Sequence, residues 1–293
     1  MPSKTIFSEN DIKIIAKNIK TENLRSLINF LNRFSTSHAN TPKTDQKRFI
    51  IKELIKHIYQ NYPEQKQPES FLRFSETFTS FKEDVSKELG VSLLPYGYSS
   101  NKKNALETLI RIADDPNWEV REYAGGAFSL IAFQQEDFYR TLLKLTKHSS
   151  VNVKRAVLFA AIGLMKRKEL TKAFDLLEPL LYENHTYIKK NLGPFILGSY
   201  LGNNYPKETF SKLNEWIKIK DEHVRWNLAM TFNNSFGNKY PDAALKILKI
   251  LAKDESKTVR RSIVSTLRSL RKRNKNLVND FLKDHSILHE ALA

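Results

Sequence analysis

Residues 117–128 of this 293-residue chain read NWEVREYAGGAF, and their apolar positions follow the period of an α-helix. At 100° per residue, Val120 and Ala124 fall on one side of that helix, where a protein core would cover them. Trp118 and Glu122 lie one turn apart on the opposite side. A large aromatic ring beside a carboxylate, away from the core face, makes this helix a candidate functional element.

The same helix pattern recurs four more times downstream. Each copy is anchored by a β-branched residue that a cation follows, and the anchors are Val120, Val153, Ile188, Val224 and Val259. A polar turn precedes each copy, and a further amphipathic helix precedes each turn, at residues 104–113, 136–147, 170–182, 206–219 and 241–252. A helix pair that repeats about every 35 residues predicts an all-α, right-handed superhelical solenoid of five HEAT-like pairs.

An N-terminal helical section precedes the regular array. Its amphipathic helices are expected at residues 8–32, 47–61 and 69–89, and a turn-rich linker at 34–46. The stretch GVSLLPYGYSSN, residues 90–101, contains Gly, Pro and Ser without a helical period, so the sequence predicts a break there. The expected parts of one continuous solenoid are a helical section at 1–95, a repeat array at 96–275 and a capping helix at 276–293.

The composition limits the classes of function. Lys and Arg number 48 against 32 Asp and Glu, a net charge of +16, which favours a polyanionic partner. Nucleic acid is the first choice; an anionic membrane surface and an acidic protein are the alternatives. The absence of cysteine excludes disulfides and Cys-ligated metal sites. Because no apolar stretch is long enough to span a bilayer and no signal peptide is evident, we expect a cytoplasmic protein.

Two columns of equivalent positions run along the second helices of the pairs. The first column directly follows the anchors and is cationic throughout: Arg121, Lys154, Lys189, Arg225 and Arg260. These cations can contact DNA phosphates, or they can hold neighbouring turns in register. Acidic residues stand five positions before three of the anchors and are available for the second role: Asp115, Glu183 and Asp254.

The second column lies one residue further on, about 200° around the helix from the anchor, so it faces away from the core. Its members are Glu122, Arg155, Lys190, Trp226 and Arg261. Further cations extend the same faces and the last helix: Lys166, Arg268, Arg271 and Lys272. The column predicts a phosphate-binding groove with a single carboxylate. For the cations of residues 268–275, a solvated helix end favoured by the helix dipole is the alternative.

The array from about residue 104 to residue 275 resembles the HEAT-repeat DNA glycosylases of the AlkC/AlkD type, which repair alkylated bases. In that family a Trp and an acidic residue one turn later share a second helix, and Trp118 and Glu122 match them in WEVRE. An Arg stands on the following second helix of the family, and Arg155 matches it in VNVKRAVLF.

AlkD-type members carry a further aromatic residue on the helix after that, and this chain departs from them there. Its segment IKKNLGPFILGSY contains Pro194 followed by Phe195 and has no Trp. Proline inside a helix removes an N–H and kinks the helix, which would turn Phe195 toward the groove. Trp226, one repeat later, is the other candidate.

The resemblance implies hydrolysis of the N-glycosidic bond of cationic N3- or N7-alkylated purines in double-stranded DNA, by a monomer at the nucleoid without cofactor or metal. In that chemistry Glu122 stabilises the charge that develops on the deoxyribose and positions a water. Trp118 attracts the cationic nucleoside through its ring, and Arg155 holds a flanking phosphate. Gly125 and Gly126 would let the DNA backbone approach closely; close helix packing is their alternative role.

Other interpretations remain open. The wider family includes members that bind branched DNA without known excision, and HEAT-like arrays commonly serve as protein-interaction scaffolds. Trp118 can be a residue of the helix start that packs on the N-terminal section. Glu122 can form a plain salt bridge with Arg155 between repeats.

Overall fold

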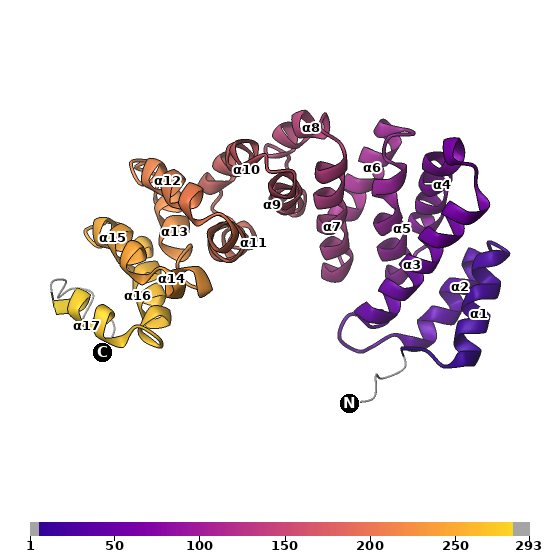
Figure 1. Ribbon diagram of the computed structural model, residues 1–293, viewed down its shortest axis with the longest axis horizontal. Helices are drawn as coiled ribbons and strands as arrows, with labels where there is room; N and C mark the ends of the chain where they lie inside the picture. The colour runs from indigo at the N-terminus through magenta and orange to yellow at the C-terminus, as the bar shows by residue number, and fades with distance from the viewer. Residues whose placement is uncertain (1–5, 284–293) are drawn as a thin grey trace. The chain divides into compact units, whose positions relative to one another are not determined.

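The computed structural model describes residues 6–283, and these residues form helices and connecting turns without a strand (Figure 1). The chain divides into two compact units, Met1–Phe138 and Tyr139–Ala293. The predicted all-α class of repeated helix pairs is confirmed, whereas the right-handed superhelix stays a prediction. Within the described part of the chain, no helix has the length and apolar character needed to cross a bilayer.

Unit 1 consists of helix pairs that follow one another along the chain. They are α1 (Glu9–Lys20), α2 (Leu24–Leu31), η1 (Asn32–Phe34), α3 (Thr44–Asn61), η2 (Glu64–Lys66), α4 (Gln67–Ser80), α5 (Asp84–Gly97), α6 (Lys102–Ala113) and α7 (Trp118–Gln134). A loop of residues 35–43 connects η1 to α3, which confirms the predicted turn-rich linker. The core of the first pairs is apolar and contains Leu27, Ile28, Ile50, Leu54 and Phe74.

The predicted break at residues 90–101 is wrong, because α5 continues to Gly97 and only a short turn separates it from α6. Gly90 lies where α4 packs closely: a Cβ on it would be 2.6 Å from Thr79 Cγ2. A residue that looks like a helix breaker therefore permits close helix packing. Val85, 35 residues before the first anchor, is buried in the same frame, so α4 and α5 form one more pair.

Unit 2 continues the pattern. Its helices are α8 (Phe138–Leu145), α9 (Val151–Lys166), α10 (Leu170–Leu177), η3 (Glu178–Tyr182), α11 (Thr186–Asn191), η4 (Leu192–Gly202), α12 (Pro206–Trp216), α13 (Glu222–Met230), α14 (Ser235–Lys239), α15 (Pro241–Leu251), α16 (Lys257–Arg271) and α17 (Lys275–Lys283). All five predicted anchors, one of them in unit 1, are fully buried. The division into parts at residues 95 and 275 stays a prediction, and residues 284–293 of the expected capping helix lie outside the described residues.

Pro194 lies in η4, where residues 192–202 follow the wider turn of a π-helix after α11 ends. Two glycines let this segment approach α13: a Cβ on Gly193 would lie 2.8 Å from the Asn227 carbonyl oxygen, and one on Gly198 would lie 2.2 Å from that of Thr231. The widened helix is thus fitted to its neighbour, and the kink at Pro194 stays a prediction.

Candidate nucleic-acid interface

The N-terminus of α7 is tied to two other parts of unit 1. Asn117 caps the helix, because its side-chain oxygen accepts from the Glu119 N–H at 2.8 Å. Its side-chain amide donates to Asp84 Oδ2 of α5 at 2.7 Å and to the Ala39 carbonyl of the 35–43 loop at 3.2 Å. These bonds fix the backbone at Trp118, the first residue of the helix.

A buried ionic cluster fixes the same turn from the inside. Lys47 of α3 places its Nζ 2.8 Å from Glu88 of α5, 2.8 Å from Glu119 of α7 and 3.0 Å from the Thr41 hydroxyl. The Thr41 hydroxyl donates to the other Glu119 oxygen at 2.6 Å. The side chains of Lys47 and Glu88 are fully buried. One ammonium group thus serves two carboxylates, and three helices and the loop meet at it.

Burial has a clear effect on the pKa of Glu88. Desolvation and, to a smaller extent, the charges of Glu119 and Asp84 raise this pKa to about 7, against the lowering effect of the neighbouring Lys47. Tyr123 of α7 lies on the same cluster, with the Lys47 ammonium 4.8 Å from its ring centroid. Burial raises the pKa of Tyr123 as well, so its hydroxyl stays protonated.

The opposite face of α7 is open. Trp118 is 42% exposed, and its ring meets that of His38 edge-on, with centroids 5.4 Å apart at 72°. Glu122, one turn later, is half-buried, and among the described residues nothing lies within 4 Å of a Cβ built on Gly126. Trp118 therefore does contact the N-terminal section, as its alternative role requires, but much of its surface remains accessible.

Phe133 also belongs to the open face of α7 and is 44% exposed. At 100° per residue it falls close to the direction of Glu122, about three turns along the helix. Phe133 is not among the predicted site residues, although its position in the helical frame is a sufficient signal. An exposed aromatic thus stands near each end of this face, with the carboxylate between them.

The first column has mainly structural contacts in unit 2. Lys154 pairs with Glu183 in the turn before the next second helix, and Arg225 pairs with Asp254 in the same way. The Arg225 Nη2 also donates to Asp254 at 3.2 Å. The acidic residue is therefore supplied by the following repeat, so these ion pairs connect neighbouring repeats.

Arg121 and Arg260 bind their own preceding turns instead. The Arg121 Nη1 donates to the carbonyl oxygens of Asp115 and Pro116, each at 2.7 Å. The Arg260 Nη1 donates to those of Asp254 and Glu255 at 2.7 and 2.8 Å. The contacts of both arginines fit the role of holding turns in register, and phosphate contact by this column stays a prediction.

Lys189, the remaining member of the first column, is only 8% exposed. Its Nζ lies 4.4 Å from the centroid of the Trp226 ring, so the cation covers part of that aromatic surface. Burial lowers the pKa of Lys189. The predicted DNA contacts of Lys189 and Trp226 would therefore require this pair to separate or to act through the exposed part of the indole.

Arg155 does not project into open solvent as the second column predicts. It is 4% exposed, and its guanidinium carbon lies 4.7 Å from the ring centroid of Phe159 and 4.6 Å from that of Tyr187. Its position faces away from the core of its own helix, but Tyr187 of α11 covers it. Arg155 lies in unit 2 and Glu122 in unit 1, so their proximity stays a prediction.

Phe195 ends this row of stacked groups. It is 41% exposed, and its ring centroid lies 6.1 Å from that of Phe159. The row thus runs from Tyr187 through the Arg155 guanidinium and Phe159 to an exposed aromatic on the π-helical segment. An accessible aromatic at Phe195 agrees with its selection as a candidate.

Nearly all of the net positive charge lies in unit 2. Residues 139–293 contain 29 Lys and Arg against 14 Asp and Glu, a net charge of +15, whereas residues 1–138 contain 19 and 18, a net charge of +1. Helix α16 has no acidic residue in its sequence. The predicted phosphate-binding residues with exposed side chains are Lys166, Lys190, Arg261, Arg268, Arg271 and Lys272.

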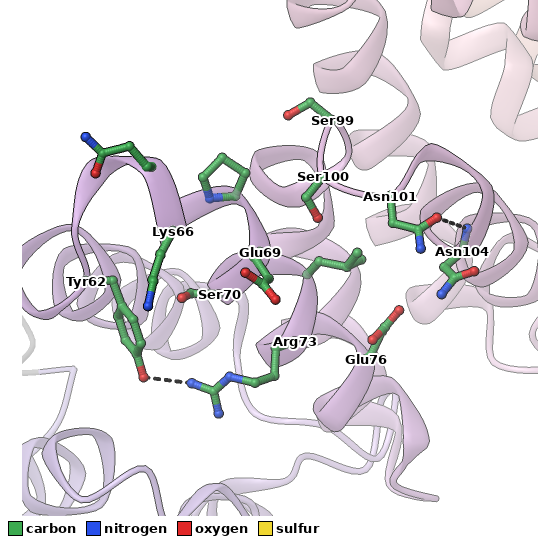
Figure 2. Close-up of a pocket in the computed structure, with 13 residues that line it drawn as sticks. Tyr62, Lys66, Glu69, Ser70, Arg73, Glu76, Ser99, Ser100, Asn101 and Asn104 are labelled. Carbon is green, nitrogen blue, oxygen red and sulfur yellow. Dashed lines mark hydrogen bonds between the residues drawn. The ribbon is translucent and has the colours of Figure 1, made fainter.

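A cavity of about 780 Å³ lies elsewhere in unit 1, between α4 and the start of α6 (Figure 2). Tyr62 and Arg73 stand at one side of it, joined by a hydrogen bond of 2.7 Å. Its lining contains carboxylates as well as cations, with Glu69 and Glu76 beside Lys66 and Arg73. This mixture does not favour a polyanion. Among residues 6–283, no three metal-ligating side chains come together.

The geometry thus defines an all-α repeat protein that has a strongly cationic unit and, on α7, an exposed Trp one turn from a half-buried Glu. Residues 194–293 match the model of a protein family described as DNA alkylation repair enzyme. The predicted resemblance is confirmed, and the match supports an enzyme role in DNA alkylation repair at the level of the family. The matched segment lies in unit 2 and does not include Trp118, Glu122 or Arg155.

No curated protein matches the chain. Among solved structures, a designed armadillo repeat protein in complex with the peptide (KR)4 is 14% identical, with a TM-score of 0.35, and the alignment covers 90% of this chain and 100% of that one. Kap121p is also 14% identical, with a TM-score of 0.41, over 95% of this chain and 32% of its own. No function is inferred from these likenesses.

Proposed function

We propose that the protein hydrolyses the N-glycosidic bond of cationic N3- or N7-alkylated purines in double-stranded DNA. The observation that carries the proposal is the pair on α7: an exposed Trp118 and, one turn later, Glu122, on a helix whose first turn is held by Asn117 and by the buried Lys47 cluster. A fixed backbone under an exposed site favours catalysis, since catalytic groups must keep their geometry.

The chemistry suits this pair. The alkylated purine carries a positive charge and leaves as a neutral base with the electrons of the C1′–N bond. Positive charge then develops on the deoxyribose, where the Glu122 carboxylate can stabilise it and accept a proton from the water that adds to C1′. The ring of Trp118 can attract the cationic nucleoside before the bond breaks. No metal or organic cofactor takes part in these steps.

Unit 2 supplies the affinity for DNA in this proposal. Its exposed cations bind the phosphates. A first-column cation also binds a phosphate where its side chain can do so without losing its contacts within the protein. Arg155 supports the aromatic row that ends in Phe195, in place of the phosphate contact that the family resemblance implies. The protein would act as a monomer on the DNA of the nucleoid.

Release of 7-methylguanine or 3-methyladenine from methylated duplex DNA tests the proposal. Under single-turnover conditions the wild-type protein is expected to release both bases. Glu122→Gln should slow the release about 100-fold, as loss of one charge-stabilising group does in other enzymes. Glu107→Gln, which removes an exposed carboxylate from α6, is the matched control and should have no effect. If the wild-type protein releases neither base, the proposed glycosylase activity is wrong.

A second candidate function is binding of bent or branched DNA without excision. Two observations favour it: the family match covers the C-terminal part of the cationic unit without the Trp–Glu pair, and Arg155 is buried between rings. Gel shifts that compare a four-way junction with a linear duplex of equal length distinguish the two functions. A non-catalytic binder should prefer the junction, and its affinity should not depend on Glu122.

A further inference from the structure

The 35–43 loop has a defined conformation of its own. The Thr36 N–H donates to the Thr41 carbonyl and the Asn40 N–H donates to the Thr36 carbonyl, both at 3.0 Å. Asn40 has φ 56°, in the left-handed region that asparagine tolerates better than most residues. Ala39 and Thr41 are buried, at 9% and 1% exposed. The loop is therefore a compact turn with two residues set into the protein.

Both buried loop residues bind the first turn of α7. The Ala39 carbonyl accepts from the Asn117 side chain, and the Thr41 hydroxyl donates to Glu119. These two partners are the neighbours of Trp118 on either side along the chain. The loop and the start of the helix consequently form one unit, although they are almost 80 residues apart in sequence.

His38 is the exposed residue that this arrangement presents beside Trp118. It directly precedes the buried Ala39, and its ring meets the indole edge-on at 5.4 Å. An imidazole carries an N–H donor in either protonation state, and donors of this kind bind phosphate oxygens. Unit 1 has a net charge of only +1, and the Glu122 carboxylate repels a DNA backbone. A donor is needed where the strand passes that carboxylate.

We propose that His38 is a further DNA-binding residue, which donates a hydrogen bond to a backbone phosphate beside the nucleotide that packs on Trp118. The inference rests on the proposed function in that it takes the open face of α7 as the DNA-facing surface. It assigns a role to the N-terminal section: this section supplies a phosphate contact to the site and holds the start of α7. The alternative is that His38 only orients the indole.

The DNA affinities of ring and donor variants of His38 at one salt concentration separate these roles. The probe is a duplex that contains one tetrahydrofuran abasic-site analogue, which lets binding be measured without base release. His38→Phe keeps an aromatic ring against Trp118 but removes the donor, and it should weaken binding about tenfold. His38→Gln restores a donor and should recover most of the affinity.

Ser37→Ala changes the adjacent exposed loop residue and is the matched control; it should leave the affinity unchanged. Wild-type affinity in His38→Phe would overturn the proposal and leave His38 with an orienting role. Absence of base release from a wild-type protein whose binding still depends on His38 would reject the glycosylase and retain the contact. Normal base release by a protein whose DNA binding does not depend on His38 would retain the glycosylase and reject the phosphate contact.

Discussion

The two units differ in how they use charge. In unit 1, cations and carboxylates are nearly equal in number, and one ammonium and two carboxylates meet in a buried cluster under the start of α7. In unit 2, cations outnumber carboxylates two to one, and many of them are exposed along the second helices. Under the proposed function, unit 2 would hold the DNA and unit 1 would present the reacting groups.

The cluster in unit 1 provides the largest expected effect on stability. Lys47→Met removes the ammonium of the buried cluster and leaves two carboxylates without their cation, so unit 1 should lose about 3–5 kcal/mol. The matched change in unit 2 is Lys154→Met, whose ion pair with Glu183 is partly exposed and should contribute at most about 1 kcal/mol. Urea denaturation of both variants measures the difference, and equal losses would contradict the contrast between the units.

Neutralising cations of α16 and of its C-cap residue should have the next largest effect, on DNA affinity. The triple change of Arg261, Arg268 and Lys272 to Gln removes three exposed cations, and binding of duplex DNA should weaken about 100-fold. The salt slope should fall by about 3 at the same time, because each of the three cations is expected to neutralise one phosphate. Fluorescence anisotropy at several salt concentrations gives both values.

The control for this prediction comes from unit 1. The triple change to Gln of three exposed lysines on α1 removes the same amount of charge; these are Lys13, Lys17 and Lys20. Affinity and slope should then stay close to those of the wild-type protein. A loss as large as that of the α16 variant would mean that DNA affinity follows total charge and not the surface of unit 2.

Much of this architecture follows from local sequence patterns. Buried apolar residues at helical spacing predicted every first and second helix from residue 104 onward, because that period is a property of each helix alone. The pair α4 and α5 was not recognised as a repeat, since Gly90 and Pro95 have the appearance of helix breakers. Gly90 is required by the neighbouring helix, which a local pattern does not contain.

Only the part of the site that lies on a single helix could be predicted from the sequence. Trp118 and Glu122 were found because they share a face of α7. The roles of Thr41 and Lys47 depend on Glu119, a residue more than 70 positions away, and no periodicity links them. Arg155 appeared to be groove-facing because its own helix leaves it uncovered, whereas Tyr187 of α11 encloses it.

The pH dependence of stability tests the cluster in a second way. Burial raises the pKa of Glu88 to about 7, so the folded protein binds this proton more tightly than the unfolded chain does. The stabilisation is complete below the ordinary pKa of 4.5 and is lost as the pH rises through 7. Glu88→Gln removes this dependence, and the wild-type protein should lose on the order of 2 kcal/mol relative to the variant between pH 5 and pH 8.

Thermal unfolding of both proteins at half-unit steps of pH gives the relative stability. Glu107→Gln, on the exposed side of α6, should show a constant offset across the same range. A constant offset for Glu88→Gln as well would mean that the carboxylate is ionised in the folded protein throughout, with Lys47 fully compensating its burial.

The smallest expected effect concerns Gly126, which lies on the open face of α7. A methyl group there meets no described atom within 4 Å apart from the backbone of α7 itself, so Gly126→Ala should stabilise the helix by about 1 kcal/mol. In unit 2 the equivalent change is costly: a Cβ on Gly237 would lie 2.1 Å from the Phe232 carbonyl oxygen, and Gly237→Ala should destabilise the protein. If DNA passes close to α7, Gly126→Ala should slow base release despite the gain in stability. A more stable variant with unchanged release would show that this glycine is not needed for the approach of DNA.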